Sequence, residues 1–162
     1  MDVTEQFRLG MRRLASGVSI IATVDEKVPK GFLATSVSSV ALKPNPCLLV
    51  CVNRSVSSHD VLLRAGFFSV NLLAQKDAEV ARRFCSPAFR EQRFVDDNWF
   101  TLSTGAPAYR DALASFDCEV ATTMAVQTHT ILIGRVVSVQ LSGNKTEPLI
   151  YFNGSFDPLR AA

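Results

Sequence analysis

The stretch Gly31-Phe-Leu-Ala-Thr-Ser-Val-Ser-Ser-Val40 decides how the rest of this sequence is interpreted. A half-buried strand normally alternates apolar and polar residues, whereas hydroxyl-bearing residues crowd the second half of this stretch. They are Thr35, Ser36, Ser38 and Ser39. The pattern predicts a bulge or a ligand-facing edge, and a solvent-facing edge strand rich in serine is the alternative.

A second unusual stretch follows directly. Pro44-Asn-Pro46 precedes the run Cys47 to Val52, which is apolar at every position and therefore predicts a central strand buried on both faces. The polar segment Asn53-Arg-Ser-Val-Ser-Ser-His59-Asp60 comes next. Two predicted strands thus end in small hydroxyl-bearing residues, a pairing that favours a cradle for a planar phosphorylated ligand.

A phosphate needs N–H donors, hydroxyls and a cation, and the first turn of a helix supplies the donors. Ser57 to Ala65 predicts a short helix with capping-box spacing between Ser57 and Asp60 and a stop at Gly66. Asn53 and Arg54 would add an amide and a positive charge. The alternative is that Ser57 only caps the helix and that Arg54 is solvated.

The remaining elements follow from periodicity and turn residues. Helices are expected after Thr4, through Phe7, Met11 and Leu14 as far as Gly17, and over Ala74 to Phe84. Further strands are expected at Val18–Val24, Lys30–Val40 (one long, bent strand), Phe67–Leu73, Ser115–Val126, His129–Leu141 and Leu149–Asn153, with a turn at Gly143-Asn144 and a mostly polar loop over 85–98. About seven strands joined by short turns, with three short helices, predict a mostly β, mostly antiparallel barrel with helical decoration.

Composition further narrows the possible classes of protein. The 162 residues, 48% apolar and 20% charged, predict one globular domain over 1–162, and a net charge of +2 without basic clusters argues against nucleic acid. The start of the chain has no secretory pattern, and Cys47 to Val52 is too short to span a bilayer, so a cytoplasmic location and no membrane are expected. The four cysteines, which follow no metal or redox spacing, are expected to be reduced thiols.

Few other residues suggest chemistry. His129 lies between two threonines at the start of an alternating strand, and Gly134 in that strand allows another backbone or a ligand to approach. No Asp or Glu stands at ligand spacing to a histidine, so no metal site is expected. No serine has a triad partner or nucleophile elbow, which argues against a hydrolase.

Motifs in order along almost the whole chain, from about Phe7 to Leu159, resemble the short-chain flavin reductase family, the reductase component of two-component flavin monooxygenases. The matching pieces are Phe7-Arg-x-x-Met11, Ser16-Gly17-Val18, Gly31-x-x-Ala34-Thr-Ser36, Ser39-Val40, Pro46 through Asn53-Arg-Ser55, Ser58-His59-Asp60, Phe68-x-Val-Asn-Leu72, Ala81-Arg-Arg-Phe84, Gly105-Ala-Pro107, His129 with Gly134-Arg-Val136, and Pro148-Leu-Ile-Tyr-Phe152. This family has an antiparallel flavin-binding split β-barrel.

The resemblance implies a set of site residues. The isoalloxazine ring would be lined by Leu33, Ala34, Thr35, Ser36, Val37, Ser39 and Val40. The ribityl and phosphate groups would be held by Asn53, Arg54, Ser58 and His59, with Arg83 and Phe84 completing the flavin site. The nicotinamide side would be bordered by His129, Tyr151 and the segment Asn153 to Phe156, including Phe156 itself.

The implied reaction is hydride transfer from NADH or NADPH to FMN or FAD, for which no general base is obligatory. His129 would tune orientation or polarity. The resemblance also implies a homodimer and a separate flavin-dependent monooxygenase that receives the reduced flavin. Two alternatives stay open: a flavin-dependent reductase of a corrin or metal centre, and a flavin-binding module without turnover.

Overall fold

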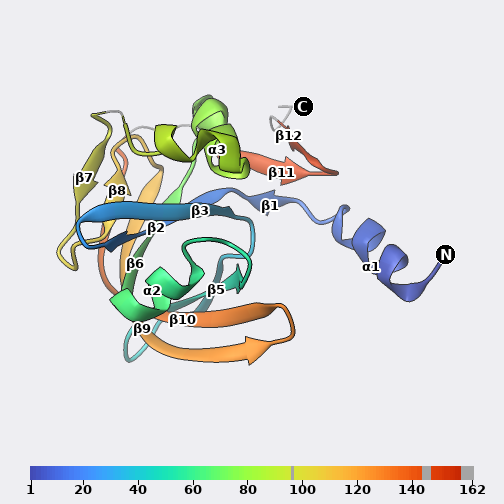
Figure 1. Cartoon of the computed structure of the whole chain (residues 1–162), viewed down its shortest axis with the longest axis horizontal. Coiled ribbons are helices and arrows are strands. Elements are labelled where there is room, and N and C mark those ends of the chain that lie inside the picture. Colours follow the sequence, from blue (N-terminus) through green and yellow to red (C-terminus); the bar gives the residue numbers. More distant parts are fainter. Residues whose placement is uncertain (96, 144–146, 158–162) are drawn as a thin grey trace.

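A curled, seven-stranded antiparallel sheet forms the body of the protein in this computed structural model (Figure 1), which describes residues 1–95, 97–143 and 147–157. From one edge to the other the strands are β3 (Val28–Ala34), β2 (Ser19–Asp25), β6 (Phe67–Leu72), β9 (Ala114–Val126), β10 (His129–Leu141), β5 (Cys47–Asn53) and β4 (Ser38–Ala41). The smaller sheets are β1 (Ser16–Gly17), β11 (Ile150–Phe152) and β12 (Ser155–Asp157), and β7 (Trp99–Thr101) with β8 (Pro107–Tyr109). The mostly antiparallel class that the sequence predicted is confirmed.

The sheet must curl because β3 and β4 are consecutive in the chain but lie at its opposite edges. Only Thr35, Ser36 and Val37 separate them, and four residue steps span at most about 14 Å. Within the described residues the two edge strands do not pair, so the sheet stays open along this line. The prediction of one bent strand over Lys30–Val40 was wrong, because the chain leaves one edge of the sheet and joins the other.

The helices are α1 (Val3–Met11), α2 (His59–Ala65) and α3 (Ala78–Cys85), with 3-10 turns η1 (Gln75–Asp77) and η2 (Pro87–Gln92) on either side of α3. α3 packs on the outside of the sheet, α2 places Leu62 in the core inside the curl, and α1 projects away from the sheet (Figure 1). α1 begins at an Asp2 cap, two residues earlier than expected, and none of its residues is buried. No helix in the described ranges is long and apolar enough to cross a membrane.

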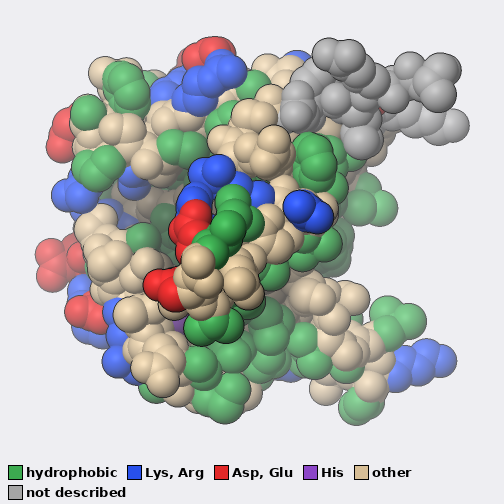
Figure 2. Space-filling model, turned by 90° about the vertical axis from the view of Figure 1, so that its right-hand side faces the viewer, with side chains coloured by type: hydrophobic (Ala, Val, Ile, Leu, Met, Phe, Trp, Pro, Cys, Tyr) green, Lys and Arg blue, Asp and Glu red, His purple; other side chains and the backbone are tan. Residues whose placement is uncertain are grey.

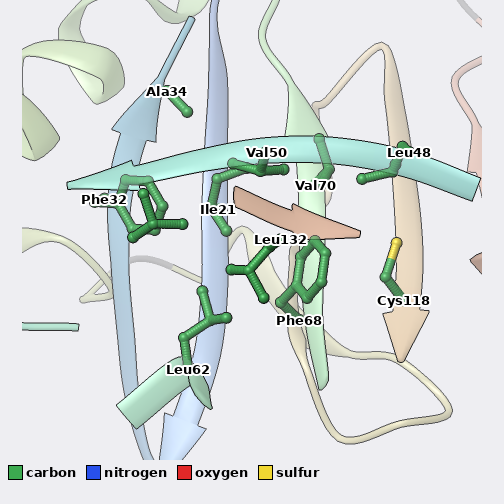
Figure 3. Close-up of a cluster of buried hydrophobic side chains, with 11 residues drawn as sticks. Ile21, Phe32, Ala34, Leu48, Val50, Leu62, Phe68, Val70, Cys118 and Leu132 are labelled. Atoms are coloured by element: carbon green, nitrogen blue, oxygen red, sulfur yellow. The ribbon is translucent and has the colours of Figure 1, made fainter. Parts of the chain in front are cut away.

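The main core lies inside the curl, where side chains from both ends of the sheet meet. Figure 3 shows Ile21, Phe32, Val50, Phe68 and Leu132 pointing toward one another, and all five are nearly inaccessible to water. A second cluster packs Val80, Ala81 and Phe84 of α3 against the outer face of β2. The aromatic rings of Phe94, Trp99 and Tyr109 extend this second cluster.

The prediction that β5 is a central strand buried on both faces was wrong. β5 is next to the edge strand β4, and its residues alternate between buried and half-buried. Leu48, Val50 and Val52 enter the core, whereas the Cys47, Leu49 and Cys51 face has only partial cover. The apolar run therefore contains one face that is buried within this chain and one face that is only partly covered.

Other predicted details are mixed. α2 starts at His59 rather than Ser57, and the expected capping box is not formed, while Gly66 ends the helix at φ 74° as predicted. The four cysteines are free thiols. The predicted turn at Gly143-Asn144 and the end of the family resemblance at Leu159 involve residues outside the described ranges.

Candidate functional site

The connection from β3 to β4 carries unused backbone groups. Thr35, Ser36 and Val37 make no backbone hydrogen bond to any described residue, because they lie between the two strands. The Ser36 hydroxyl fixes the connection to β5: it lies 3.2 Å from both the carbonyl oxygen and the amide nitrogen of Cys51. A planar polar ligand lying along this segment would find free N–H and C=O groups on a backbone that is held in place.

A cavity of about 240 Å³ lies between β3, the start of α2 and the end of α3. Its lining residues are Gly31, Phe32, Ser55, Val56, Ser57, Ser58, Phe84, Cys85, Pro87, Arg90 and Arg93. Two arginines and three serines line it, and none of the lining residues is acidic. This donor set, without a competing carboxylate, is suited to an anion with several acceptor oxygens, such as a phosphate.

Ser58 is the most deeply buried polar residue of this cavity, at 2% exposure. Its backbone is in the αR region, so its hydroxyl does not cap α2 and makes no side-chain hydrogen bond within the described residues. The N–H groups of Ser57 and Ser58 also donate to no described backbone carbonyl. The Ser58 hydroxyl and these two N–H groups are therefore donors that a ligand in the cavity could use.

A second cavity of about 200 Å³ adjoins the first. The two share Gly31, Ser57, Ser58, Arg90 and Arg93, and the second extends toward Lys30, Glu91 and Phe94. The shared residues form one basic wall that faces both spaces. We call the 240 Å³ cavity with this wall the cradle.

Sequence analysis missed Arg90 and Arg93, the two cations of the cradle. Both lie in the stretch 85–98, which was expected to be a polar loop and instead contains η2. Burial, and to a lesser extent the nearby Arg90, lowers the pKa of Arg93, while burial raises the pKa of the neighbouring Cys85 thiol. The available signal was three arginines within eleven residues, at 83, 90 and 93, following a predicted helix.

The residues predicted to hold the phosphate differ in where the structure places them. Ser58 and Phe84 line the cradle. Arg83 does not line it, and its guanidinium donates to the carbonyl oxygen of Gln92 at 3.3 Å. His59 is buried, with Nδ1 2.7 Å from Asp60 Oδ1 and Nε2 2.9 Å from Thr130 Oγ1, so both ring nitrogens already have protein partners.

Asn53, Arg54 and His129 meet where β5 and β10 end. Asn53 pairs with His129 across the two strands, and the Arg54 amide donates to Thr128 O at 3.0 Å. The Asn53 side chain accepts from the amide and the hydroxyl of Ser55, both at 2.9 Å, which shapes the turn that leads to the cradle. His129 is half-buried and its Nδ1 lies 2.9 Å from the Thr128 hydroxyl, leaving Nε2 for a ligand.

The predicted ring-lining residues divide between two regions. Leu33 and Ala34 end β3 and pack on the two core clusters. Val37, Ser39 and Val40 line a larger, mostly apolar cavity of about 660 Å³ beside β4. Thr35 and Ser36 belong to the connection with unused backbone groups, between these two regions.

The predicted nicotinamide residues are not all brought together. Tyr151 and Phe156 pack ring against ring on β11 and β12, with centroids 5.9 Å apart, and the Asn153 amide donates to Arg12 O. Figure 1 shows this hairpin at the upper right and the β9–β10 turn that leads into His129 at the lower right, with α1 projecting on the same side. Among the described residues, no hydrogen bond or ring contact joins Tyr151 or Phe156 to His129.

The sequence and fold of this chain are similar to those of known proteins. A protein-family model described as "Flavin reductase like domain" matches residues 11–160. The FMN reductase (NADH) RutF of Bradyrhizobium diazoefficiens is 38% identical over 156 residues, which cover 96% of this chain and 86% of that protein.

Two solved structures have a closely similar fold. BorF, the flavin reductase component of a bacterial two-component tryptophan halogenase, is 30% identical with a TM-score of 0.88, covering 98% of this chain and 99% of BorF. The NADH:FAD oxidoreductase SgcE6 of Streptomyces globisporus C-1027 is 25% identical with a TM-score of 0.90, covering 100% of this chain and 97% of SgcE6.

Proposed function

The chain belongs to the flavin reductase-like family, and on this premise we propose that it is an NAD(P)H-dependent flavin reductase that reduces FMN or FAD. The reduced flavin passes to a separate flavin-dependent oxygenase, as the names of its two-component relatives suggest. The cradle carries this proposal, because its two arginines, three serines and free amides fit a flavin phosphate. The relatives named for FMN and for FAD leave both flavins as candidates.

The residues have separate tasks in this proposal. Ser58 and Arg90 hold the phosphate, Arg93 adds its positive charge, and the free backbone groups of Thr35 to Val37 orient the ring. Phe84 gives the cradle an apolar wall. When bound, the flavin supplies the hydride-accepting ring and the dinucleotide supplies the hydride, so the protein's contribution is to bind, align and exclude water.

The proposed activity is tested by mixing the purified protein with NADH or NADPH and following absorbance at the nicotinamide wavelength with FMN, FAD or no flavin. We expect multiple-turnover oxidation that depends on added flavin. Flavin binding without oxidation would favour a binding module, and reduction that requires a corrin or metal acceptor would favour the other alternative. Absence of both flavin binding and oxidation would contradict the proposed function.

The same assay tests His129. His129→Ala is expected to raise the KM for the nicotinamide about tenfold, the effect of losing one hydrogen bond of about 1.4 kcal/mol, with FMN affinity unchanged. Thr128→Val, which removes the hydroxyl bonded to His129 Nδ1 but keeps the ring, should give a smaller change. An unchanged KM in His129→Ala would remove His129 from the nicotinamide side.

The protein acts as a homodimer in this proposal. α1 exposes Val3, Phe7 and Met11 at 80%, 67% and 49%, an apolar stripe on a helix with no buried residue. Figure 2 looks onto this end of the molecule and shows hydrophobic side chains gathered around the helix. A second copy would cover this face, and would offer its β11–β12 hairpin to the site that one chain leaves without Tyr151 and Phe156.

Sedimentation equilibrium is expected to give a mass twice that of the 17.7 kDa chain. Phe7→Asp should shift the protein to the monomer, because it places a charge in the apolar stripe. Arg13→Asp, at an exposed position outside that stripe, is the matched control. A wild-type monomer at micromolar concentration would contradict the proposal.

Two further expectations belong to this proposal. A single domain over 1–162 remains a prediction from length and from the family match over 11–160. A cytoplasmic location is supported by four free thiols, since reduced cysteines persist in a reducing compartment.

A further inference from the structure

Arg93 makes four side-chain hydrogen bonds to described residues around the cradle. Its Nε donates to Arg83 O at 3.1 Å and its Nη1 to Gly31 O at 3.1 Å. Its Nη2 donates to Phe84 O at 3.3 Å and to Ser86 O at 3.1 Å. The same guanidinium lies over the Phe84 ring, 5.4 Å from its centroid.

These four carbonyl oxygens belong to two elements that lie on different sides of the cradle. Arg83, Phe84 and Ser86 form the end of α3, where the last carbonyls of a helix lack partners within the helix. Gly31 belongs to β3 on the other side of the cradle. Arg93 therefore joins the end of α3 to β3 through its planar fork, a geometry that lysine does not reproduce.

The contact between the end of α3 and β3 is also tightly packed. A Cβ added to Gly31 would lie 2.6 Å from the Ile21 carbonyl oxygen, 3.1 Å from Phe94 Cζ and 3.3 Å from Phe84 Cε1. The end of α3 is thus held closely against β3 at the position where Arg93 bridges them. A small shift of α3 here would move Phe84 and Cys85 together, and both line the cradle.

Charge reinforces this geometry. Arg90 and Arg93 both face the cradle, and their mutual repulsion adds to burial in lowering the pKa of Arg93. An anion between them would relieve that repulsion. With four of its N–H groups given to carbonyls, Arg93 acts on such an anion through its charge and through the position of the wall.

We infer that Arg93 is a positioning residue that locks the end of α3 onto β3 and so sets how tightly the cradle binds the phosphate of the flavin. This inference rests on the proposed function. It predicts different effects on two flavins. Loss of the Arg93 bonds should reduce the affinity for FMN and leave the affinity for riboflavin, which has no phosphate, almost unchanged.

The experiment compares FMN and riboflavin binding, by flavin fluorescence titration, in wild type, Arg93→Lys, Arg93→Met and Arg110→Met. Arg93→Lys keeps the charge but loses the fork that joins α3 to β3, and we expect its Kd for FMN to rise about tenfold, corresponding to about 1.4 kcal/mol of phosphate binding lost when the wall shifts. Its Kd for riboflavin should change by about twofold or less on the same scale. Arg93→Met, which also loses the charge, should weaken FMN binding further.

Arg110→Met is the matched control, because Arg110 is exposed and lies 5.2 Å from the Phe100 centroid, outside the cradle. It should bind both flavins as wild type does. Equal loss of FMN and riboflavin affinity in Arg93→Lys, or no loss, would overturn the inference and leave Arg93 as a helix cap. If wild type binds neither flavin, the proposed function itself fails.

A measurement on wild type keeps the inference testable even if the variants do not fold. Amide hydrogen exchange in residues 83–93 should slow when FMN is bound and much less when riboflavin is bound at equal saturation. Equal protection by the two ligands would contradict a link between this segment and the phosphate.

Discussion

Arg90→Glu is expected to weaken FMN binding about a hundredfold, while riboflavin affinity changes about threefold or less. The substitution changes the net charge of the cradle from two positive charges to none, since Arg90 and Arg93 are the charged residues of its lining. Charge-assisted bonds to phosphate contribute about 1.5–3 kcal/mol each, and 2.8 kcal/mol corresponds to about a hundredfold. Arg90 is exposed on η2, so the fold should tolerate the change.

Fluorescence titration at two salt concentrations measures this effect. The difference between wild type and Arg90→Glu should shrink at high salt, because exposed charges are screened. Arg110→Glu makes the same charge change outside the cradle and should leave the FMN Kd within about threefold of wild type by the same arithmetic. If FMN and riboflavin affinities fall equally in Arg90→Glu, the cradle does not hold the phosphate.

Gly134→Ala is expected to lower the free energy of unfolding by about 2–3 kcal/mol, or about 4–12 °C in Tm for a chain of this size. A Cβ at this position would lie 2.5 Å from Phe68 Cζ, 3.0 Å from Phe68 Cε1 and 3.1 Å from Cys118 Cβ. Phe68 is fully buried in the main core and cannot swing into solvent (Figure 3). Sequence analysis expected Gly134 to allow a close approach, and the approaching group is this ring.

Urea unfolding followed by circular dichroism checks this prediction. Gly10→Ala is the control, because a Cβ there meets nothing within 4 Å and the residue lies in α1, where alanine is favoured over glycine. In the background of Gly134→Ala, Phe68→Leu should cost less stability than in wild type, because the smaller side chain removes the overlap. Additive losses in the double variant would show that the ring is not the cause.

Long strands with one face in the core were predictable. β10 has the bounds that alternation predicted, His129–Leu141, and β9 begins one residue before the predicted start at Ser115. In β10 half-buried and buried residues alternate from His129 to Gly134, whereas the later residues of both strands are mostly exposed. The crowd of hydroxyl-bearing residues after Gly31 was also informative, because it marked a connection whose backbone is unpaired.

Elements whose role depends on distant neighbours were predicted less well. The run Cys47–Val52 is apolar whether a strand is central or next to an edge, so β5 was misplaced. Arg90 and Arg93 stand in a stretch without hydrophobic periodicity. Arg93 donates to the carbonyl oxygen of Gly31, 62 residues earlier in the chain, and Arg90 lines the same cavity as Gly31; a local sequence pattern reports neither relation.

The β-rich class, the family and the hydroxyl-bearing residues of the candidate site could be read from the residues alone, because these depend on residue type and short-range spacing. Tertiary packing sets two further features: the chain crosses from one sheet edge to the other at Thr35–Val37, and Arg90 and Arg93, in and just after η2, line the same cavity as Ser58. The physical reason is that curling of the sheet and packing of α3 on β3 bring together groups far apart in the chain. Their proximity is a property of the packed molecule rather than of any one segment.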